Sequence, residues 1–319
     1  MNMGFKVIKS GMLSTIQDLG RYGHRKSGVI VSGSMDKLAL KIGNLLLGNK
    51  EEEAGLEITL IGPVLLFEKE QLIVLTGADL SPSIDGIPLT MWRPTYVPKG
   101  ALLSFGKPIK GCRTYLSVSG GFKIKPALGS SATYLQAGIG GWEGRALKAG
   151  DQIPFNQVIK DSGKFSWSPD LKLYPNPDTQ TIRVIAGPEF NLFSEESRQA
   201  FFNEIFNISK ENNRMGYRLD GPEIQLTIAR EMLSSAVAFG TIQVPPKGKP
   251  IVLMADCQTT GGYPRIANVI TPDLSILAQK QTGNEIKFEL ITLAEAQKYL
   301  LHQEQQLKQL KHAISLKHG

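Results

Sequence analysis

The apolar residues of this 319-residue chain occur mostly in short runs that turn-forming residues separate. Runs such as Leu60–Phe67, Arg113–Ser119 and Ile251–Ala255 contain β-branched or aromatic residues and have glycine, proline or aspartate within or beside them. The chain also contains 33 glycines and 18 prolines, which interrupt helices and favour tight turns. Runs of this length with such flanks predict β-strands. We therefore expect a mainly β fold built from many short strands.

Three segments have a helical spacing of apolar residues instead. The first spans Met35–Leu47, with Ser34 as a candidate N-cap, and the second follows Ser194, where two glutamates in the first turn suit the helix dipole. The third is the C-terminal segment, in which Thr292 and Glu295 form a capping box before leucine or isoleucine recurs every seven residues. The second set of positions in this heptad repeat (Ala296, Gln303, Leu310 and Lys317) is only half apolar. We therefore expect this helix to dock along the protein's own surface rather than form a coiled coil.

The length of the chain suits two domains. The best candidate for a linker is the segment 166–181, which contains three prolines among other turn-forming residues. It separates a glycine-rich first half from a second half that begins again with a strand near Arg183. We therefore predict a β-rich lobe over 1–170, a second lobe over 171–292 and a C-terminal helix over 293–319.

Composition excludes several classes of function. The net formal charge of +7 is a mild excess, and part of it lies in the C-terminal segment, where a solvated basic face accounts for it. The sequence contains no nucleic-acid-binding motif, no signal peptide and no apolar run of membrane-spanning length. The two cysteines, Cys112 and Cys257, lie far apart, which excludes a disulfide framework and a cysteine zinc site. We expect a cytoplasmic protein with no nucleic-acid partner, no membrane partner and no metal site.

Several widespread catalytic motifs are absent from the sequence. There is no dinucleotide-binding GxGxxG, no Walker phosphate loop, no HExxH and no GxSxG. Only four histidines occur, three of them near the C-terminus, which disfavours a Ser-His-Asp triad. Two S-x-x-K matches, at Ser34 and Ser104, lack their companion motifs and are interpreted as chance.

Four clusters combine charged or hydroxyl residues with glycines in segments expected to be turns. Arginines bind carboxylates or phosphates through two parallel hydrogen bonds, and glycines let backbone N–H groups approach a ligand. A structural role also explains each residue, because Asp18 and Arg21 can form a turn-stabilising ion pair and Asp36 can cap a helix. The clusters lie within 15–36, 113–134, 140–151 and the paired segments 213–218 and 256–263.

The fourth cluster is the strongest functional candidate. It places Arg214 and Arg218 in one segment and a run of amide and hydroxyl side chains from Gln258 to Tyr263 in another. The second segment follows the predicted strand Ile251–Ala255, so its side chains are expected at a strand end, where a barrel exposes its loops. We interpret this pair of segments as a site for anions and amides.

The order of these motifs is similar to that of a known family. The chain resembles the KipA family, also known as the C subunit of 5-oxoprolinase or as allophanate hydrolase subunit 2, which corresponds to the C-terminal half of the urea carboxylase carboxyltransferase domain. Two departures are modest, since Ser34 and Cys257 stand where many members carry alanine and arginine. The resemblance covers residues 4–292 and rests on TIQDLGR (15–21), SGSMD (32–36), Gly120-Gly121, LGSSATY (128–134), GGWEGRALKAGD (140–151), NRMGYRLDGP (213–222), QTTGGYP (258–264) and PDLSILAQ (272–279).

The resemblance implies a fold and an assembly. The fold would be mainly β, with two β-barrel-like lobes, the second cyclophilin-like, a few helices and the C-terminal helix. The assembly would add two partner proteins, one KipI-like (the B subunit) and one LamB/YcsF-like (the A subunit). Together the three proteins cleave a small-molecule amide, 5-oxo-L-proline, to L-glutamate with ATP and Mg²⁺. We therefore expect a subunit of a hydrolase complex that is inactive alone.

The chemistry suggests roles for individual residues. The lactam of 5-oxoproline is a stable amide, and phosphorylation by ATP would activate it for attack by water. Such a step needs cations at the phosphate and donors at the developing oxyanion. In our hypothesis Arg214 and Arg218 neutralise the phosphate or the substrate carboxylate, while an amide and two hydroxyls hold the lactam. The catalytic candidates are Arg214, Gln258, Thr259 and Thr260, and the substrate-binding candidates are Arg218, Tyr263, Asp18, Arg21, Arg113 and Arg145.

Two other functions fit the same residues. A biotin-dependent carboxyltransferase would hold carboxybiotin and urea or another amide in these loops, with the biotin carrier and the ATP module on partner chains. A non-catalytic KipA-like regulator would bind a KipI-like kinase inhibitor and perform no chemistry of its own. Turnover by the reconstituted complex separates an enzyme from a regulator, and a neighbouring biotin carboxylase would favour the carboxyltransferase.

Overall fold

The computed structural model describes residues 4–157, 168–228 and 230–318. The chain divides into two compact units, one formed by Met1–Tyr22, Ser32–Tyr174 and Gln305–Gly319, the other by Gly23–Val31 and Pro175–Glu304. We call them the sheet unit and the barrel unit. The units differ from the predicted lobes because the segment 23–31 joins the second unit and the C-terminal helix is divided at residue 305.

The sheet unit contains two antiparallel sheets with one shared core. Their strand orders are β11-β1-β4-β9-β6-β7 and β2-β3-β10-β5-β8. Phe5, Phe67, Phe122 and Phe155 lie in this core with ring centroids 5.8–6.1 Å apart. The strands are β1 (Phe5–Lys9), β2 (Leu13–Gln17), β3 (Gly55–Thr59), β4 (Val64–Phe67), β5 (Gln71–Asp79), β6 (Pro82–Ile84), β7 (Ile87–Pro88), β8 (Thr95–Val97), β9 (Leu102–Phe105), β10 (Lys110–Val118) and β11 (Gln152–Ile153).

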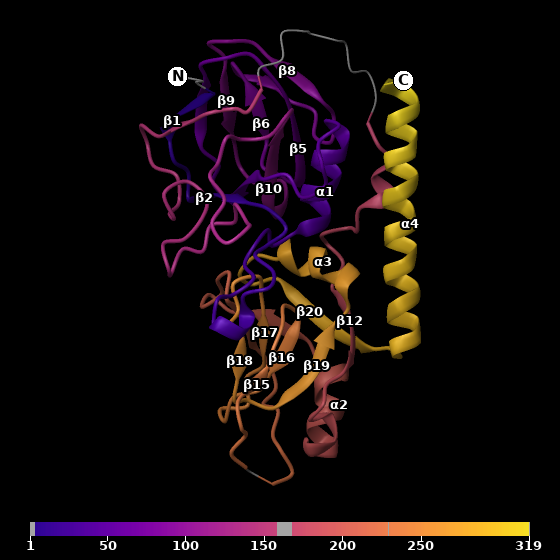
Figure 1. The fold of residues 1–319 in the computed structure, drawn as a ribbon. Helices are drawn as coiled ribbons and strands as arrows, with labels where there is room; N and C mark the ends of the chain where they lie inside the picture. The colour runs from indigo at the N-terminus through magenta and orange to yellow at the C-terminus, as the bar shows by residue number, and fades with distance from the viewer. Residues whose placement is uncertain (1–3, 158–167, 229, 319) are drawn as a thin grey trace. The chain divides into compact units, whose positions relative to one another are not determined.

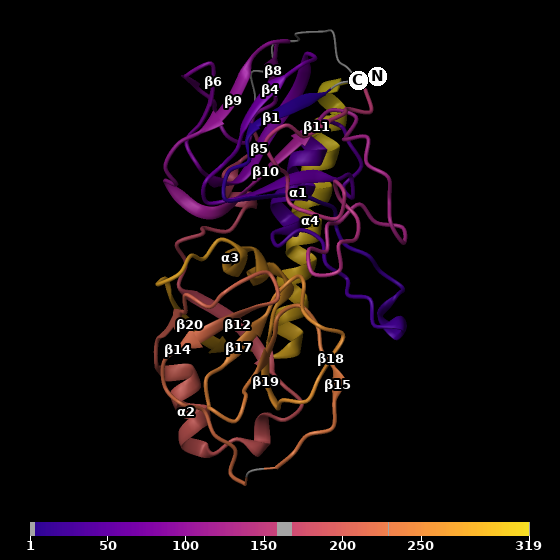
Figure 2. The same cartoon turned by 90° about the vertical axis from the view of Figure 1, so that its left-hand side faces the viewer.

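The barrel unit contains a closed barrel in the strand order β12-β19-β16-β17-β14-β13-β20. Neighbouring strands are antiparallel except β12 and β20, which run parallel and complete the circle. Figure 2 shows β12, β17 and β19 in the barrel and α2 outside it. The strands are β12 (Thr181–Ala186), β13 (Phe206–Ile208), β14 (Gly216–Asp220), β16 (Thr241–Gln243), β17 (Ile251–Leu253), β19 (Arg265–Val269) and β20 (Glu285–Leu290), beside a separate pair, β15 (Ser235–Ala236) and β18 (Thr260–Gly261).

The barrel interior follows from the two-residue period of its strands. In β20, Ile286 and Phe288 are buried, whereas Lys287 and Glu289 are exposed. The Phe288 ring stacks on Phe201 of α2 with centroids 4.5 Å apart. This contact packs α2 against β20 and joins the helix to the apolar core of the unit.

The α-helices of the described residues are α1 (Lys37–Leu46), α2 (Glu195–Asn203), α3 (Leu274–Ala278) and α4 (Leu293–His318). The three predicted helices are confirmed, and α3, within the PDLSILAQ motif, is an addition. The candidate N-cap Ser34 is wrong and the capping role of Asp36 is confirmed, because Asp36 accepts the N–H of Ala39 at 3.0 Å. The capping box is confirmed, since Thr292 N–H donates to Glu295 at 2.8 Å and Glu295 N–H donates back at 3.2 Å.

The helix α4 packs on the protein's own surface, as expected. In the sheet unit, Leu307, Leu310 and Ile314 are buried in one cluster with the apolar face of α1. Figure 1 shows α4 running beside α1. In the barrel unit, the guanidinium of Arg183 lies 3.8 Å from the ring centroid of Tyr299. Leu307 and Ile314 belong to the repeat of one apolar residue every seven positions that the sequence shows. Their burial confirms the prediction that this helix docks on the protein.

The mainly β fold with a few helices and a C-terminal helix is confirmed. The second half forms the closed barrel, and the strands of the first half form the two sheets described above. The single strand predicted over Leu60–Phe67 is wrong in its first half, since β3 ends at Thr59 and β4 begins at Val64. Leu60 has a φ of 55°, and a Cβ at Gly62 would lie 2.3 Å from the Phe105 ring, so the chain turns here.

Candidate functional site

Thr260 lies on a two-stranded ribbon of the barrel unit formed by β15 and β18, and Thr259 directly precedes its second strand. The two strands pair antiparallel, and Val237 N–H extends the pairing by donating to the Thr259 carbonyl at 3.2 Å. The side chain of Thr260 is exposed, and those of Gln258 and Thr259 are half-buried. The ribbon therefore presents the Thr260 hydroxyl to solvent, as the sequence predicted for a segment after a barrel strand.

Two arginines hold the backbone of this ribbon. Arg25 donates to the backbone carbonyl oxygens of Val237 and Thr259, the second at 3.0 Å. Arg265 donates through Nη1 to the carbonyl of Ala236 at 3.0 Å and binds the carboxylate of Glu189 at 2.6 and 2.8 Å. Hydrogen bonding to Arg265 holds the pKa of Glu189 below its usual range. The ribbon is thus fixed through its main chain, which leaves its hydroxyl side chains available.

Gln243, at the end of β16, has a buried side-chain amide that lies beside two predicted site residues, Gln258 and Tyr263. Its Nε2 donates to the carbonyl oxygen of Tyr263 at 3.2 Å, and its Oε1 lies 3.5 Å from Nε2 of Gln258. A Cβ at Gly261 would lie 2.6 Å from Gln243 Nε2. Close approach of this amide therefore explains the first glycine of the QTTGGYP motif.

Arg214, just before β14, is buried against Asp256. Its Nε and Nη2 donate to the two carboxylate oxygens of Asp256 at 2.9 and 3.0 Å, and Asp256 N–H donates to the Arg214 carbonyl at 2.8 Å. Both side chains are at most 6% exposed. The pair sets the start of the segment that carries Gln258 and Thr259. Direct contact between Arg214 and a phosphate stays a prediction.

Arg218 and Tyr263 are the predicted binding residues of this unit whose side chains are well exposed. The Nε of Arg218 lies 3.4 Å from a carboxylate oxygen of Glu211, in a pair whose side chains are 55% and 68% exposed. Tyr263 is 46% exposed. An exposed ion pair of this kind exchanges partners at little cost, so Arg218 can bind an anion.

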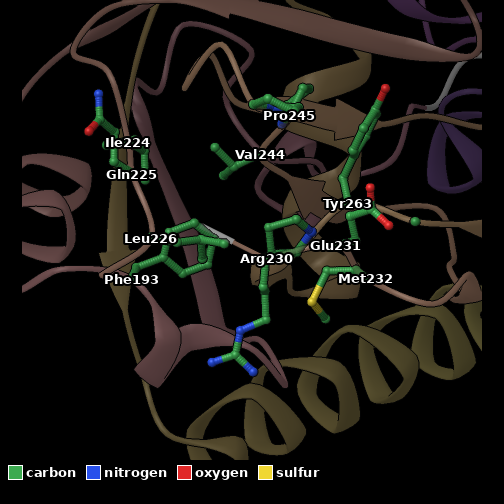
Figure 3. Close-up of a pocket in the computed structure, with 13 residues that line it drawn as sticks. Phe193, Ile224, Gln225, Leu226, Arg230, Glu231, Met232, Val244, Pro245 and Tyr263 are labelled. Carbon is green, nitrogen blue, oxygen red and sulfur yellow. The ribbon is translucent and has the colours of Figure 1, made fainter. Parts of the chain in front are cut away.

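A cavity of about 680 Å³ lies beside Tyr263 in the barrel unit (Figure 3). Its walls are mostly apolar, and Phe193 and Val244 are buried there. Arg230 and Glu231 add opposite charges to the lining. This size and this mixture of apolar walls with a few polar groups are typical of small-molecule sites. The lining residues are Phe193, Ile224, Gln225, Leu226, Arg230, Glu231, Met232, Val244, Pro245, Pro246, Gly262, Tyr263 and Pro264.

Asp18 lies in the sheet unit and binds the neighbouring loop. Its Oδ1 accepts the N–H of Gly20 and the hydroxyl of Ser130, both at 2.8 Å, and its Oδ2 accepts the N–H of Ser131 at 2.6 Å. These hydrogen bonds join two of the motifs on which the family resemblance rests, TIQDLGR and LGSSATY. The carboxylate satisfies donors of a loop that would otherwise be left without partners.

Arg21 binds the same loop as Asp18 and is fully buried. It donates to the carbonyl oxygens of Ala127 at 2.9 Å and Ala132 at 2.8 Å. A Cβ at Gly140 would lie 2.6 Å from its Nη2, which explains that glycine of a third motif. Arg21 therefore joins three loops of the sheet unit, and its proposed contact with substrate stays a prediction.

Arg113, on β10, belongs to a buried polar network. Its Nε lies 3.9 Å from Oε1 of Glu57, whose Oε2 accepts the hydroxyl of Tyr115 at 2.6 Å and the N–H of Met35 at 2.8 Å. Burial, followed by the charge of Glu57, raises the pKa of Tyr115 well above its usual value. The network anchors the SGSMD motif to the sheet and lies inside the unit.

Arg145 forms an ion pair at the surface of the sheet unit. Its two terminal nitrogens donate to the carboxylate of Asp151 at 2.7 and 2.9 Å, and Glu143 binds the same guanidinium. Hydrogen bonding to Arg145 holds the pKa of Asp151 below its usual range. The Arg145 side chain is 28% exposed. Its role in binding substrate stays a prediction.

Three residues that lie beside predicted site residues in the barrel unit were not predicted from the sequence. They are Gln243, Arg25 and Arg230. A glutamine inside a short apolar strand was the available signal for Gln243. No local signal identifies Arg25, because its partner Thr259 is 234 residues away in the chain. Arg230 lies outside every recognised motif.

The described residues contain neither a cluster of metal-ligand type nor a helix of membrane-spanning type. Over 4–157, 168–228 and 230–318, no three side chains of the His, Cys, Asp and Glu types gather as a metal site would require. In the same part of the chain, no helix combines the length and the apolar character needed to cross a bilayer.

Comparison with known proteins identifies relatives over most of the chain. A family profile described as "Carboxyltransferase domain, subdomain A and B" matches residues 27–290. Two relatives are named as the C subunit of 5-oxoprolinase. The chain is 41% identical over 304 residues to that of Haemophilus influenzae and 42% identical over 306 residues to that of Escherichia coli. These alignments cover 95% and 96% of this chain and 96% and 97% of the two relatives.

A solved structure shares the fold over nearly the whole chain. The urea amidolyase of K. lactis superposes with a TM-score of 0.90 at 29% sequence identity. The superposition covers 97% of this chain but only 20% of that protein. This chain thus matches one part of the much longer K. lactis protein.

Proposed function

The chain belongs to the family of carboxyltransferase domains with subdomains A and B, and from that membership we propose that it is the C subunit of a 5-oxoprolinase. One observation carries the proposal: 41% and 42% identity to two proteins named as this subunit of 5-oxoprolinase, over nearly the full length of all three chains. The reaction we propose is hydrolysis of 5-oxo-L-proline to L-glutamate with ATP.

The assembly that performs this reaction contains further proteins. We propose a KipI-like protein and a LamB/YcsF-like protein as the partners, in the cytoplasm. ATP, with Mg²⁺, is the co-substrate of the complex. The chain alone is proposed to be inactive, because the proposed reaction requires all three proteins of the complex.

The proposed chemistry activates a stable amide in two steps. The lactam oxygen of 5-oxoproline attacks the γ-phosphorus of ATP, the bond between the γ-phosphorus and its bridging oxygen breaks, and ADP leaves. Hydrolysis then consumes two waters. The first adds to the activated carbon and the carbon–nitrogen bond breaks, which leaves an acyl phosphate on the glutamate side chain, and the second attacks this acyl phosphate so that its bond to phosphate breaks. The products are glutamate and inorganic phosphate. Positioned donors at the lactam and cations near the phosphoryl group would supply the stabilisation that this reaction needs.

The ribbon supports this chemistry through its geometry. The Thr260 hydroxyl is exposed on a main chain that Arg25 and Arg265 hold, so it can donate to a lactam oxygen without reorganising the loop. Gln258 and Thr259 are its half-buried neighbours. We assign Arg214 a positioning role, because it acts on this segment through Asp256.

The experiment is reconstitution of the chain with its proposed partners, with omission of each protein in turn. Glutamate formation and ADP release that require 5-oxoproline and all three proteins are expected. Thr260→Ala is expected to lower kcat by about tenfold or more, as loss of one positioned donor does. Thr181→Ala, which removes an exposed hydroxyl from a barrel strand outside the ribbon, is the matched control and is expected to retain full activity.

A carboxyltransferase that acts on urea or another amide is the second candidate. The superposition on the urea amidolyase favours it. Biotin would then be the cofactor, carried by a partner chain. The assay is transfer of carboxyl from carboxybiotin to urea by the chain with a biotin carboxylase partner. A chain that assembles with the KipI-like partner, does not turn over 5-oxoproline and carboxylates urea would replace our proposal with this one.

A further inference from the structure

The barrel unit contains seven arginines, and one of them differs from the others. In the described part of the chain, five bind a carboxylate and Arg25 binds backbone carbonyls, whereas Arg230 has no hydrogen-bond or ion-pair partner. The pairs are Arg183–Asp273, Arg198–Glu195, Arg214–Asp256, Arg218–Glu211 and Arg265–Glu189. A guanidinium without a partner retains all its donors for a ligand.

This arginine lines the cavity of about 680 Å³ that Tyr263 also lines. In Figure 3 the aliphatic stem of Arg230 has Phe193 and Leu226 on one side and Met232 on the other, and its guanidinium extends beyond them, away from Pro245. The cavity walls are mostly apolar. An anion with a small apolar body therefore suits the site, because its charge can pair with Arg230 while its carbon atoms leave water.

Glu231 narrows the choice of anion. It lines the same cavity, and in Figure 3 its carboxylate lies on the side of Tyr263 rather than beside the Arg230 guanidinium. A carboxylate accepts hydrogen bonds and repels further negative charge. A ligand with one carboxylate and one N–H donor satisfies both residues, whereas a triphosphate would bring several negative charges close to Glu231.

We propose that this cavity binds 5-oxo-L-proline, with the carboxylate of the ligand on Arg230, its lactam N–H toward Glu231 and its ring methylenes on the apolar wall. This assignment rests on the proposed function, which names the substrate but not where the chain holds it. The cavity volume of about 680 Å³ is ample for one such ring. Arg230, rather than the buried Arg214, then supplies the charge that recognises the substrate.

The test compares two ligands on two variants of the full chain. Titration calorimetry measures binding of 5-oxo-L-proline and of 2-pyrrolidinone, which has the same lactam ring without the carboxylate. Arg230→Ala is expected to weaken 5-oxoproline binding by at least about tenfold and to leave 2-pyrrolidinone binding unchanged. Arg230→Lys, which keeps the charge but loses the planar fork, is expected to lie between. Lys249→Ala removes an exposed cation outside the cavity and is the matched control.

The outcomes separate this proposal from the proposed function. Unchanged 5-oxoproline affinity in Arg230→Ala, with an unchanged KM in the reconstituted complex, overturns the cavity assignment while the activity of the complex stands. Loss of ATP affinity instead, with 5-oxoproline affinity retained, overturns it as well and identifies the anion as the triphosphate. If the wild-type complex shows no 5-oxoproline turnover but the chain binds 5-oxoproline through Arg230, the cavity assignment stands and the proposed function fails.

Discussion

Two groups of motif residues in this chain differ in what their polar side chains contact. In the sheet unit, Asp18 and Arg21 bind groups of the loop 127–132, and each lies within the fold. In the barrel unit, Thr260 and Tyr263 expose their side chains. The first group builds loop structure, and the second group is available to a ligand.

The comparison shows that the kind of residue in a motif does not reveal its role. A buried arginine that donates to carbonyl oxygens can bind a ligand only if those oxygens lose their donor, which costs about 1–3 kcal/mol for each group left unsatisfied. An exposed residue beside a cavity has no such cost. We therefore expect substitutions in the first group to lower stability and substitutions in the second group to lower binding or activity.

The largest expected effect is on a buried pair within the barrel unit itself. Arg214→Met leaves the Asp256 carboxylate buried without its partner, and we expect a loss of about 3–5 kcal/mol in the free energy of unfolding. Urea denaturation followed by circular dichroism measures this loss. Arg230→Met, the same substitution at an exposed arginine of the same unit, is expected to change stability by about 0.5 kcal/mol at most. Equal losses in the two variants would contradict the distinction.

A smaller loss is expected in the sheet unit. Asp18→Ala removes the acceptor of three donors, and we expect a decrease of about 1–3 kcal/mol in the free energy of unfolding. Hydrogen exchange should become faster at the Ser131 amide, which the carboxylate binds. Asp220→Ala removes an aspartate from an exposed ion pair and serves as control, with an expected loss below about 1 kcal/mol. Unchanged exchange at Ser131 would argue against the structural role of Asp18.

The surface pair Arg145–Asp151 should contribute less, and in a pH-dependent way. Because the pKa of Asp151 is lowered in the folded state, the pair stabilises the protein above the unfolded pKa of about 3.9 and this contribution disappears as pH falls through the folded pKa. We expect at most about 1 kcal/mol, since the pair is partly solvated. Unfolding of the wild-type protein and Asp151→Asn should differ most near neutral pH and converge in acid. A difference that grows in acid would refute the assignment.

The smallest effect on stability is expected on the ribbon. Thr260→Ala should change the free energy of unfolding by less than about 0.5 kcal/mol, because its side chain is exposed. Thr133→Ala, at a buried threonine of the sheet unit whose hydroxyl donates to the Ile16 carbonyl at 2.8 Å, should cost about 1–2 kcal/mol. Thermal and urea unfolding of the two variants measure the difference. Similar losses would show that exposure does not separate the two groups.

Much of the fold could be predicted from sequence because it depends on local pattern. Helix α2 begins after Ser194, and α4 begins at the capping box of Thr292 and Glu295, since caps act within one turn. For α1 the sequence offered Ser34 as an N-cap and also a capping role for Asp36, because serine and aspartate both cap well, and only the backbone geometry selects Asp36. The break after Thr59 was missed because it depends on close packing between Gly62 and the distant Phe105.

The candidate site was predictable as a set of segments but not as a set of contacts. The position of Thr260 at the surface follows from its place after a barrel strand. The pairing of Arg214 with Asp256 does not, although both residues belong to the same predicted cluster. Gln243 and Arg230 lie outside the recognised motifs, and only the folded barrel shows that they lie beside Tyr263.

The amino-acid sequence by itself determined the β-rich character of this chain, the places where helices begin and the family to which its motifs point. These properties follow from residue spacing and from short motifs, which act over a few positions. The tertiary structure decided which charges are already paired and which are open to a ligand. The sequence singled out Arg214 and not Arg230, but Arg214 meets a carboxylate 42 positions away in a buried pair and Arg230 lines a cavity. Burial and pairing arise from contacts between distant segments, so they exist only once the barrel has closed.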